Sequence, residues 1–255
     1  MNKTKLVGIL NITPDSFSDG GAFFRSQDAL VHIKQLANDG AYIIDIGAES
    51  TRPGATPLSA DEEWQRLEPV LKLLPQVNNV QFSLDTRHAQ TARKALAYNI
   101  HWINDVSGFS DLGMQQAVRN ADCKLVVMHS LSVPADKNIV LSDSLDAVEE
   151  ILGFAKHRIQ ELENAGIKRD RIIFDPGIGF GKTASQSWEI VRGIKRFEVL
   201  GVPLLVGHSR KSFLSSTSAD RDAATLAVSR DLINQGVSYL RVHDVAAHAR
   251  MLSDG

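Results

Sequence analysis

Eight short apolar runs recur along the 255-residue chain, and each one leads into polar or small residues. The runs are rich in Val, Ile and Leu and show little strict alternation, which is typical of strands buried on both faces in a parallel sheet. They are Leu6–Leu10, Tyr42–Ile46, Val80–Leu84, Trp102–Ile103, Leu125–Met128, Ile172–Phe174, Leu204–Val206 and Tyr239–Val242.

Segments with helical spacing separate the apolar runs. Ser59 begins one of them with a capping box to Glu62, Leu145–Ala165 forms a longer one, and Asp222–Gln235 forms another. Eight strand–helix units over 255 residues leave about 32 residues for each unit, which is enough for a βα repeat. The repeat predicts an α/β protein, a (β/α)8 TIM barrel in which residues 1–255 form a single domain. A doubly wound open sheet is the alternative.

Composition argues against nucleic-acid and membrane partners and against disulfide bonds. Twenty-eight Lys and Arg against 30 Asp and Glu give a net charge of −2, which argues against nucleic acid or an anionic membrane surface as the main partner. The single cysteine, Cys123, cannot form an internal disulfide, which fits a reducing compartment. No run approaches the ~18 apolar residues of a membrane span. We therefore expect a cytoplasmic protein with no nucleic-acid or membrane partner.

Each of the eight runs ends at a polar or ionisable residue. In a barrel these positions meet at the carboxyl-terminal mouth, where barrel enzymes place their active sites. A single Asp or Asn at such a position often caps the next helix, but capping does not explain all eight. The set is Asn11, Asp45 with Glu49, Asp85, Asn104 with Asp105, His129, Asp175, His208 with Ser209, and Arg241 with His243.

The residue types at this mouth combine hydrogen-bond acceptors with separate cations. Carboxylates and amides suit a neutral ring that carries N–H groups, and cations suit phosphate, so the set favours a heterocycle with a diphosphate. The sequence Asn11-Ile12-Thr13 is not the His-x-His pair of amidohydrolase barrels, and Pro176 stands where a phosphate-binding P-loop needs glycine. The cations are Arg52, Arg210, Lys211, Arg241 and His243.

Two stretches, 12–25 and 48–58, are too polar and too rich in turn residues to be helical. Long loops in compact domains tend to be lids or binding loops. We expect these two loops to close over a bound substrate, and a surface excursion without a role is the alternative.

Seven segments of the chain resemble the signatures of the dihydropteroate synthase family, in the family's order. They are Leu10–Gly21, Asp45–Gly54, Leu84–Arg87, Ile103–Gly108, Phe174–Lys182, Ser209–Phe213 and Arg241–Asp244. The family's fold is an eight-stranded α/β barrel, in agreement with the repeat. Its reaction joins para-aminobenzoate to 6-hydroxymethyl-7,8-dihydropterin diphosphate and releases diphosphate and 7,8-dihydropteroate.

The resemblance implies how the matched residues would bind the pterin. Asp85, Asn104 and Asp175 would hold the ring, because their side-chain oxygens accept hydrogen bonds from its amino and N–H groups. Lys211 would meet the carbonyl side of the pterin and lay its aliphatic stem along the aminobenzoate.

The resemblance also implies a dissociative reaction. Arg241 and His243 would hold the diphosphate, and Asn11 would help to place Mg²⁺ beside it. Diphosphate would leave first, because the electron-rich dihydropterin delocalises the resulting cation, and the aminobenzoate nitrogen would then add.

The remaining implied contacts concern the aminobenzoate and the rim of the site. Ser212 would offer backbone N–H groups to the benzoate carboxylate. The residues expected from the two loops are Phe17, Thr51, Arg52 and Pro53. Further expected substrate contacts are Phe180, Gly207, Ser209 and Arg210.

Three features depart from the family's usual pattern: Ser130, His208 and the pair Gln186-Ser187. They put the shape of the pocket in doubt more than the activity. Two alternatives remain, a catalytically silent pterin-binding paralogue and a methyltransferase that uses methyltetrahydrofolate. The first should lack members of the cation or loop set, and the second handles no diphosphate. A homodimer is expected from the resemblance alone.

Overall fold

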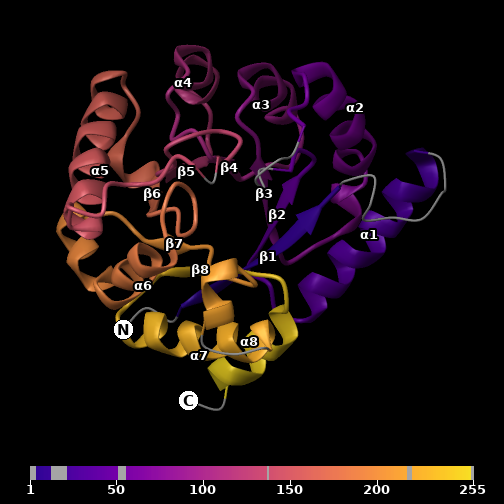
Figure 1. Ribbon diagram of the computed structural model, residues 1–255. Helices are drawn as coiled ribbons and strands as arrows, with labels where there is room; N and C mark the ends of the chain where they lie inside the picture. The colour runs from indigo at the N-terminus through magenta and orange to yellow at the C-terminus, as the bar shows by residue number, and fades with distance from the viewer. Residues whose placement is uncertain (1–3, 13–21, 51–55, 137, 217–219, 254–255) are drawn as a thin grey trace.

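Eight parallel strands pair in the order β6-β5-β4-β3-β2-β1-β8-β7 (Figure 1). A parallel bridge between Phe174 and Leu204 joins β6 to the start of β7, so the sheet closes into a barrel and the open-sheet alternative is excluded. The computed structural model describes residues 4–12, 22–50, 56–136, 138–216 and 220–253. The strands are β1 (Lys5–Asn11), β2 (Ile43–Gly47), β3 (Gln81–Asp85), β4 (Trp102–Asp105), β5 (Lys124–Met128), β6 (Ile172–Asp175), β7 (Leu205–Val206) and β8 (Tyr239–Val242).

Helices surround the strands on the outside of the barrel (Figure 1). They are α1 (Ala22–Asn38), α2 (Ala60–Leu71), α3 (Ala89–Ala95), α4 (Leu112–Val118), α5 (Ala147–Asn164), α6 (Ala184–Arg192), α7 (Arg221–Asn234) and α8 (Val245–Ser253). Short 3-10 turns are η2 (Leu74–Gln76), η3 (Arg169–Arg171), η4 (Ile194–Leu200) and η5 (Ser212–Ser216). No helix in the described ranges is both long and apolar enough to cross a membrane.

Local signals set the helix ends. The predicted capping box is present, because the Ser59 hydroxyl accepts from the Glu62 N–H at 3.2 Å and the Glu62 carboxylate accepts from the Ser59 N–H at 2.9 Å. The predicted loop over 12–25 is too long at its end, since α1 already begins at Ala22. Residues 13–21 lie outside the described residues.

The interior of the barrel is divided into an apolar layer and a polar layer. The apolar layer consists of Val7, Ile43, Trp102, Val126, Ile173 and Leu205, with the partly buried Tyr239 packed against it. Side chains alternate between the two faces of a strand, so a residue two positions further along also points inward. By this rule Asp45, Asn104, Asp175 and Arg241 lie directly above the apolar layer, toward the carboxyl ends of the strands. The fold therefore gathers polar and charged groups from β2, β4, β6 and β8 in one place.

Candidate active site

Arg241 lies at the centre of the polar layer. Its Nε donates to Asp45 Oδ2 at 2.6 Å, and its Nη2 donates to Asp85 Oδ2 at 3.0 Å. Asn104 Nδ2 donates to the same Asp45 oxygen at 3.0 Å. These three hydrogen bonds connect β2, β3, β4 and β8 across the inside of the barrel, which brings the predicted residues Asp85, Asn104 and Arg241 together.

The members of this network differ in depth. The side chain of Asp45 is 1% exposed, whereas those of Asp85 and Arg241 are 21% and 20% exposed. Burial raises the pKa of the Asp85 carboxyl, the nearby Asp45 raises it further, and Arg241 opposes both effects. Asp85 and Arg241 thus reach the surface of the mouth, and Asp45 lies beneath them.

Asp175 and Lys211 form the opposite side of the mouth. The Gly177 N–H donates to Asp175 Oδ1 at 2.7 Å, and burial raises the pKa of the Asp175 carboxyl while the charge of Lys211 opposes the rise. Lys211 Nζ donates to the Ile178 carbonyl and lies 4.4 Å from the centre of the Phe180 ring. Burial lowers the pKa of Lys211 to about 8. The structure therefore places Lys211, Phe180 and Asp175 together, as predicted.

Gly207 leaves space between the two sides. A Cβ at this position would lie 3.7 Å from Asp175 Oδ2 and 3.8 Å from Arg241 Cβ. A larger side chain would extend into the gap between these groups, so glycine keeps the mouth open.

Lys182 is a buried residue of this region that the sequence did not reveal. Its Nζ donates to the carbonyls of Gly177 and Phe180, both at 2.8 Å, and lies 2.8 Å from His129 Nδ1. Burial lowers the pKa of the Lys182 ammonium well below its usual value. The His129 carbonyl is a fourth, longer partner at 3.3 Å, so the N–H groups of Lys182 are fully used within the chain. Lys182 therefore links the glycine-rich turn, which follows Asp175 and contains Phe180, to His129 at the end of β5 by hydrogen bonds.

Substituting Gly177 by alanine tests how tightly this turn is packed. Gly177 has φ +65°, and a Cβ there would lie 1.9 Å from the His129 carbonyl oxygen. Gly201→Ala is a matched control, because Gly201 has φ +63° but nothing within 4 Å of its Cβ position. Both variants carry the left-handed backbone cost of about 1–2 kcal/mol, and only Gly177→Ala adds an overpacking cost of about 1–3 kcal/mol. Urea unfolding measures the difference, and equal losses would contradict the clash.

Ser209, Arg210 and His243 lie around the end of β8. The Ser209 hydroxyl is 2.9 Å from His243 Nδ1 and accepts from the His243 N–H at 3.3 Å. The Arg210 guanidinium donates to both carboxylate oxygens of Asp222 on α7, at 2.6 and 2.9 Å. This ion pair holds two of its nitrogens within the chain, and the contact of Arg210 with substrate stays a prediction.

The other predicted contacts are placed only in part. Ser212 begins η5 and is exposed. Asn11 is the last residue of β1 and pairs with Gly47 in the neighbouring strand. The four predicted loop residues lie outside the described residues: Phe17, Thr51, Arg52 and Pro53.

Asn11 is compatible with a magnesium ion that is held mainly by substrate. Within the described part of the chain, no group of three or more His, Cys, Asp or Glu side chains could hold a metal ion. Mg²⁺ prefers oxygen ligands and commonly binds through one or two protein groups together with substrate phosphates. The amide oxygen of Asn11 has the chemistry of such a ligand.

The departures from the family pattern make contacts of their own. His208 is fully buried, with Nε2 2.8 Å from Ser229 Oγ on α7, and that hydroxyl lies 2.9 Å from His248 Nε2 on α8. Burial lowers the pKa of His208 to about 3, so its imidazole is neutral at pH 7. His208 thus connects the β7 end to two outer helices.

Gln186 and Ser130 also form hydrogen bonds with nearby segments of the protein. Gln186 forms a capping box with Thr183 at the start of α6, and its Nε2 donates to the Leu141 carbonyl at 3.0 Å. The Ser130 hydroxyl donates to the Ser132 carbonyl at 2.7 Å. Ser187 donates to the Thr183 carbonyl at 2.8 Å. These hydrogen bonds stabilise local turns and helix ends.

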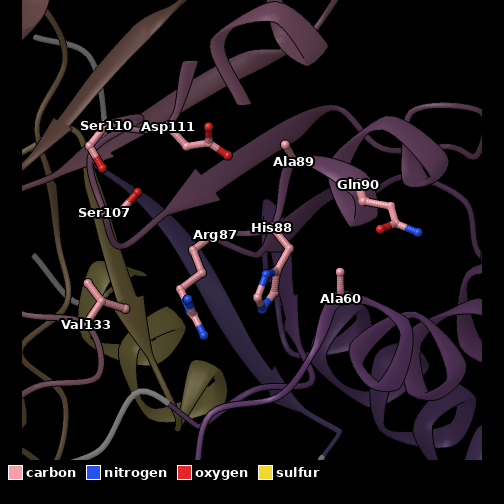
Figure 2. Close-up of a pocket in the computed structure, with 9 residues that line it drawn as sticks. All are labelled: Ala60, Arg87, His88, Ala89, Gln90, Ser107, Ser110, Asp111 and Val133. Carbon is pink, nitrogen blue, oxygen red and sulfur yellow. The ribbon is translucent and has the colours of Figure 1, made fainter. Parts of the chain in front are cut away.

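A pocket of about 420 Å³ lies beside the segments that follow β3 and β4 (Figure 2). None of the predicted ring-binding or diphosphate-binding residues lines it. Arg87 in this pocket is bound by both Glu49 oxygens, at 2.8 and 2.9 Å, and Glu49 also accepts from the Leu58 N–H. Glu49 thereby ties together the two ends of the loop over 48–58. The pocket is lined by Ala60, Arg87, His88, Ala89, Gln90, Ser107, Ser110, Asp111 and Val133.

An eight-stranded barrel with acidic, amide and basic groups at its carboxyl-terminal mouth is suited to binding a polar ring and an anionic group together. Residues 7–243 match the family described as pterin binding enzyme. This match covers more than half of the chain, and the chain therefore belongs to the family of pterin-binding enzymes.

Within that family, relatives named dihydropteroate synthase are similar over nearly their full length. The enzyme of Streptococcus pyogenes serotype M6 is 37% identical over 250 residues, which cover 95% of this chain and 91% of that protein. The structure of Xanthomonas albilineans dihydropteroate synthase with 4-aminobenzoic acid has a TM-score of 0.91 at 37% identity, covering 99% of this chain and 92% of that one.

A longer relative is also similar. The folate synthesis bifunctional protein of Chlamydia caviae is 41% identical over an alignment of 261 positions, which includes 98% of this chain. This chain spans 58% of the length of that relative.

Proposed function

We propose that the protein is a dihydropteroate synthase, which condenses 6-hydroxymethyl-7,8-dihydropterin diphosphate with para-aminobenzoate. The observation that carries this proposal is the grouping of Asp85 and Asn104 with Arg241 on one side of the mouth, with Asp175 and Lys211 on the opposite side. The similarity to the Xanthomonas enzyme, whose structure contains 4-aminobenzoic acid, supports the choice of second substrate.

The acceptors at the mouth suit the hydrogen-bonding pattern of a pterin ring. The ring presents amino and N–H donors, and the oxygens of Asp85, Asn104 and Asp175 accept them. Lys211 supplies the complementary donor for the ring carbonyl. Its ammonium lies 4.4 Å from the centre of the Phe180 ring, and its aliphatic stem offers an apolar surface for the aromatic ring of the aminobenzoate.

The cations at the mouth suit a leaving diphosphate. Arg241 and His243 stabilise the negative charge that develops on diphosphate as its bond to the pterin methylene breaks. Bound Mg²⁺, held by Asn11 and the diphosphate oxygens, would supply further charge neutralisation. The dihydropterin delocalises the methylene cation, and the aminobenzoate nitrogen then adds to it and gives up one proton to the released diphosphate or to solvent. The reaction therefore uses no nucleophile from the protein.

An assay with both substrates tests this function. Purified protein with the pterin diphosphate, para-aminobenzoate and Mg²⁺ should release diphosphate and form 7,8-dihydropteroate, and release should depend on para-aminobenzoate. Pterin binding by folded protein without turnover would support the silent paralogue instead. Lys211, Arg241 and His243 argue against the methyltransferase, which handles no diphosphate. The homodimer implied by the resemblance is a further proposal, which sedimentation velocity tests.

A further inference from the structure

We propose that Asp45 is a positioning residue for this reaction, which orients Asn104 and Arg241 without touching substrate. This inference rests on the proposed function. It concerns the deepest carboxyl group of the polar layer, which is neither a predicted ring ligand nor a predicted diphosphate ligand.

The position of Asp45 keeps it away from substrate. It is the third residue of β2, where it pairs with Ile9 of β1 and Ser83 of β3. Its side chain is 1% exposed, while Asp85 and Arg241 above it are each about a fifth exposed. A ligand at the mouth meets Asp85 and Arg241 first, so Asp45 acts only through its neighbours.

Asp45 determines which atom of Asn104 faces the mouth. A carboxylate oxygen accepts hydrogen bonds and does not donate them, so the Asn104 atom 3.0 Å from Asp45 Oδ2 is the amide nitrogen. The Asn104 oxygen, which accepts no hydrogen bond from the described residues, can then accept from a ring N–H. Without Asp45 the amide can rotate by 180° and present its N–H groups to the donors of the ring.

Asp45 also fixes the plane of the Arg241 guanidinium. The Nε–Asp45 and Nη2–Asp85 hydrogen bonds hold two sides of the planar group. Among the described residues, Arg241 Nη1 makes no hydrogen bond, so its two N–H groups are available to a phosphate oxygen. Preorganised donors stabilise developing charge without a cost of reorientation during the reaction.

Substitutions of Asp45 can separate the loss of its hydrogen-bond acceptor from the loss of its negative charge. Both hydrogen bonds use Oδ2, and Oδ1 is buried without a partner in the described part of the chain. In Asp45→Asn the amide oxygen can take the Oδ2 position and keep both bonds. Asp45→Ala removes the acceptor, and Asp45→Val removes it while filling most of the space.

The experiment measures binding and turnover in these three variants. Asp45→Ala and Asp45→Val should lose about 10²-fold in kcat/KM, the typical cost of misplaced catalytic groups, with an unchanged KM for para-aminobenzoate. Both should bind 6-hydroxymethylpterin at least tenfold more weakly by calorimetry. Asp45→Asn should recover most of that affinity. In an Asn104→Ala background, Asp45→Ala should cost much less pterin affinity than it does in the wild type, because the two residues share one function.

Three results would overturn the proposal. They are wild-type pterin affinity in both Asp45→Ala and Asp45→Val, a failure of Asp45→Asn to recover affinity, and fully additive losses with Asn104→Ala. The binding measurements separate this inference from the proposed function. Wild-type protein that binds 6-hydroxymethylpterin but gives no dihydropteroate refutes the activity, and the variants still decide the role of Asp45.

Discussion

Arg241→Met is expected to lower kcat/KM for the condensation by about 10³-fold or more, which is the range found when an arginine that neutralises a leaving phosphate is removed. Two losses contribute. The developing charge on diphosphate loses its fixed donors, and Asp45 and Asp85 lose the cation that lies between them. Without the charge of Arg241, burial and the nearby Asp45 raise the pKa of Asp85 unopposed, so the acceptor at Asp85 is weakened as well. Steady-state kinetics with varied pterin diphosphate measure the effect.

The control variants separate charge from geometry. Arg241→Lys keeps the charge, but an ammonium lacks the planar fork that reaches Asp45 and Asp85 together, so it should recover only part of the loss. Arg230→Met makes the same change as Arg241→Met at an exposed position of α7 and should leave kcat/KM unchanged. Full activity in Arg241→Lys would contradict the importance of the fork. Activity close to the wild type in Arg241→Met would refute the assigned role of Arg241.

The barrel could be predicted from the sequence because its strands are short and buried on both faces. Tyr239–Val242 was predicted with the bounds that the structure has. Strand β4 was predicted two residues short, since Asn104 and Asp105 are polar yet continue the strand. A polar residue at the end of a barrel strand faces the mouth, where it can bind a ligand. The same polarity interrupts the apolar pattern by which the strand is recognised in the sequence.

Alternation along the strands also separates residues that the sequence grouped together. Asn104 points inward to Asp45, whereas Asp105 accepts from the N–H groups of Ser107 and Phe109 in the following loop. Strand parity could have made this distinction, because Asn104 lies two residues after the inward-facing Trp102. The deep position of Asp45 follows from the same rule.

Other features depend on contacts between distant segments, which strand patterns do not encode. Arg210 has φ +58° in the turn after β7, and its guanidinium binds Asp222 on α7. Lys182 reaches back to His129, 53 positions earlier in the chain. Side-chain directions in such turns are set by the backbone conformation of each loop, so the residue type alone did not distinguish Arg210 from Lys211.

Asp175→Asn is expected to lower kcat/KM by about 3–4 kcal/mol, or roughly 10²–10³-fold, because a hydrogen bond to a charged acceptor is replaced by a clash of donors. The Gly177 N–H donates to Asp175 Oδ1 at 2.7 Å. To keep this bond, the amide oxygen of the variant must occupy the Oδ1 position, which turns its NH₂ group to the Oδ2 position. That position lies beside the space left by Gly207. The amide would therefore point N–H groups at the N–H groups of the ring.

The same geometry predicts that stability changes little, since the bond to Gly177 survives, and this distinguishes a binding role from a structural one. Asp170→Asn is the matched control. It makes the same chemical change at an exposed residue of η3, which precedes the amino-terminal end of β6, whereas Asp175 lies at the carboxyl-terminal end. It should leave both stability and kcat/KM unchanged. Kinetics together with urea unfolding decide between the outcomes. A parallel loss of stability and activity in Asp175→Asn would assign Asp175 to the fold of the turn, and wild-type kinetics would exclude it from ring binding.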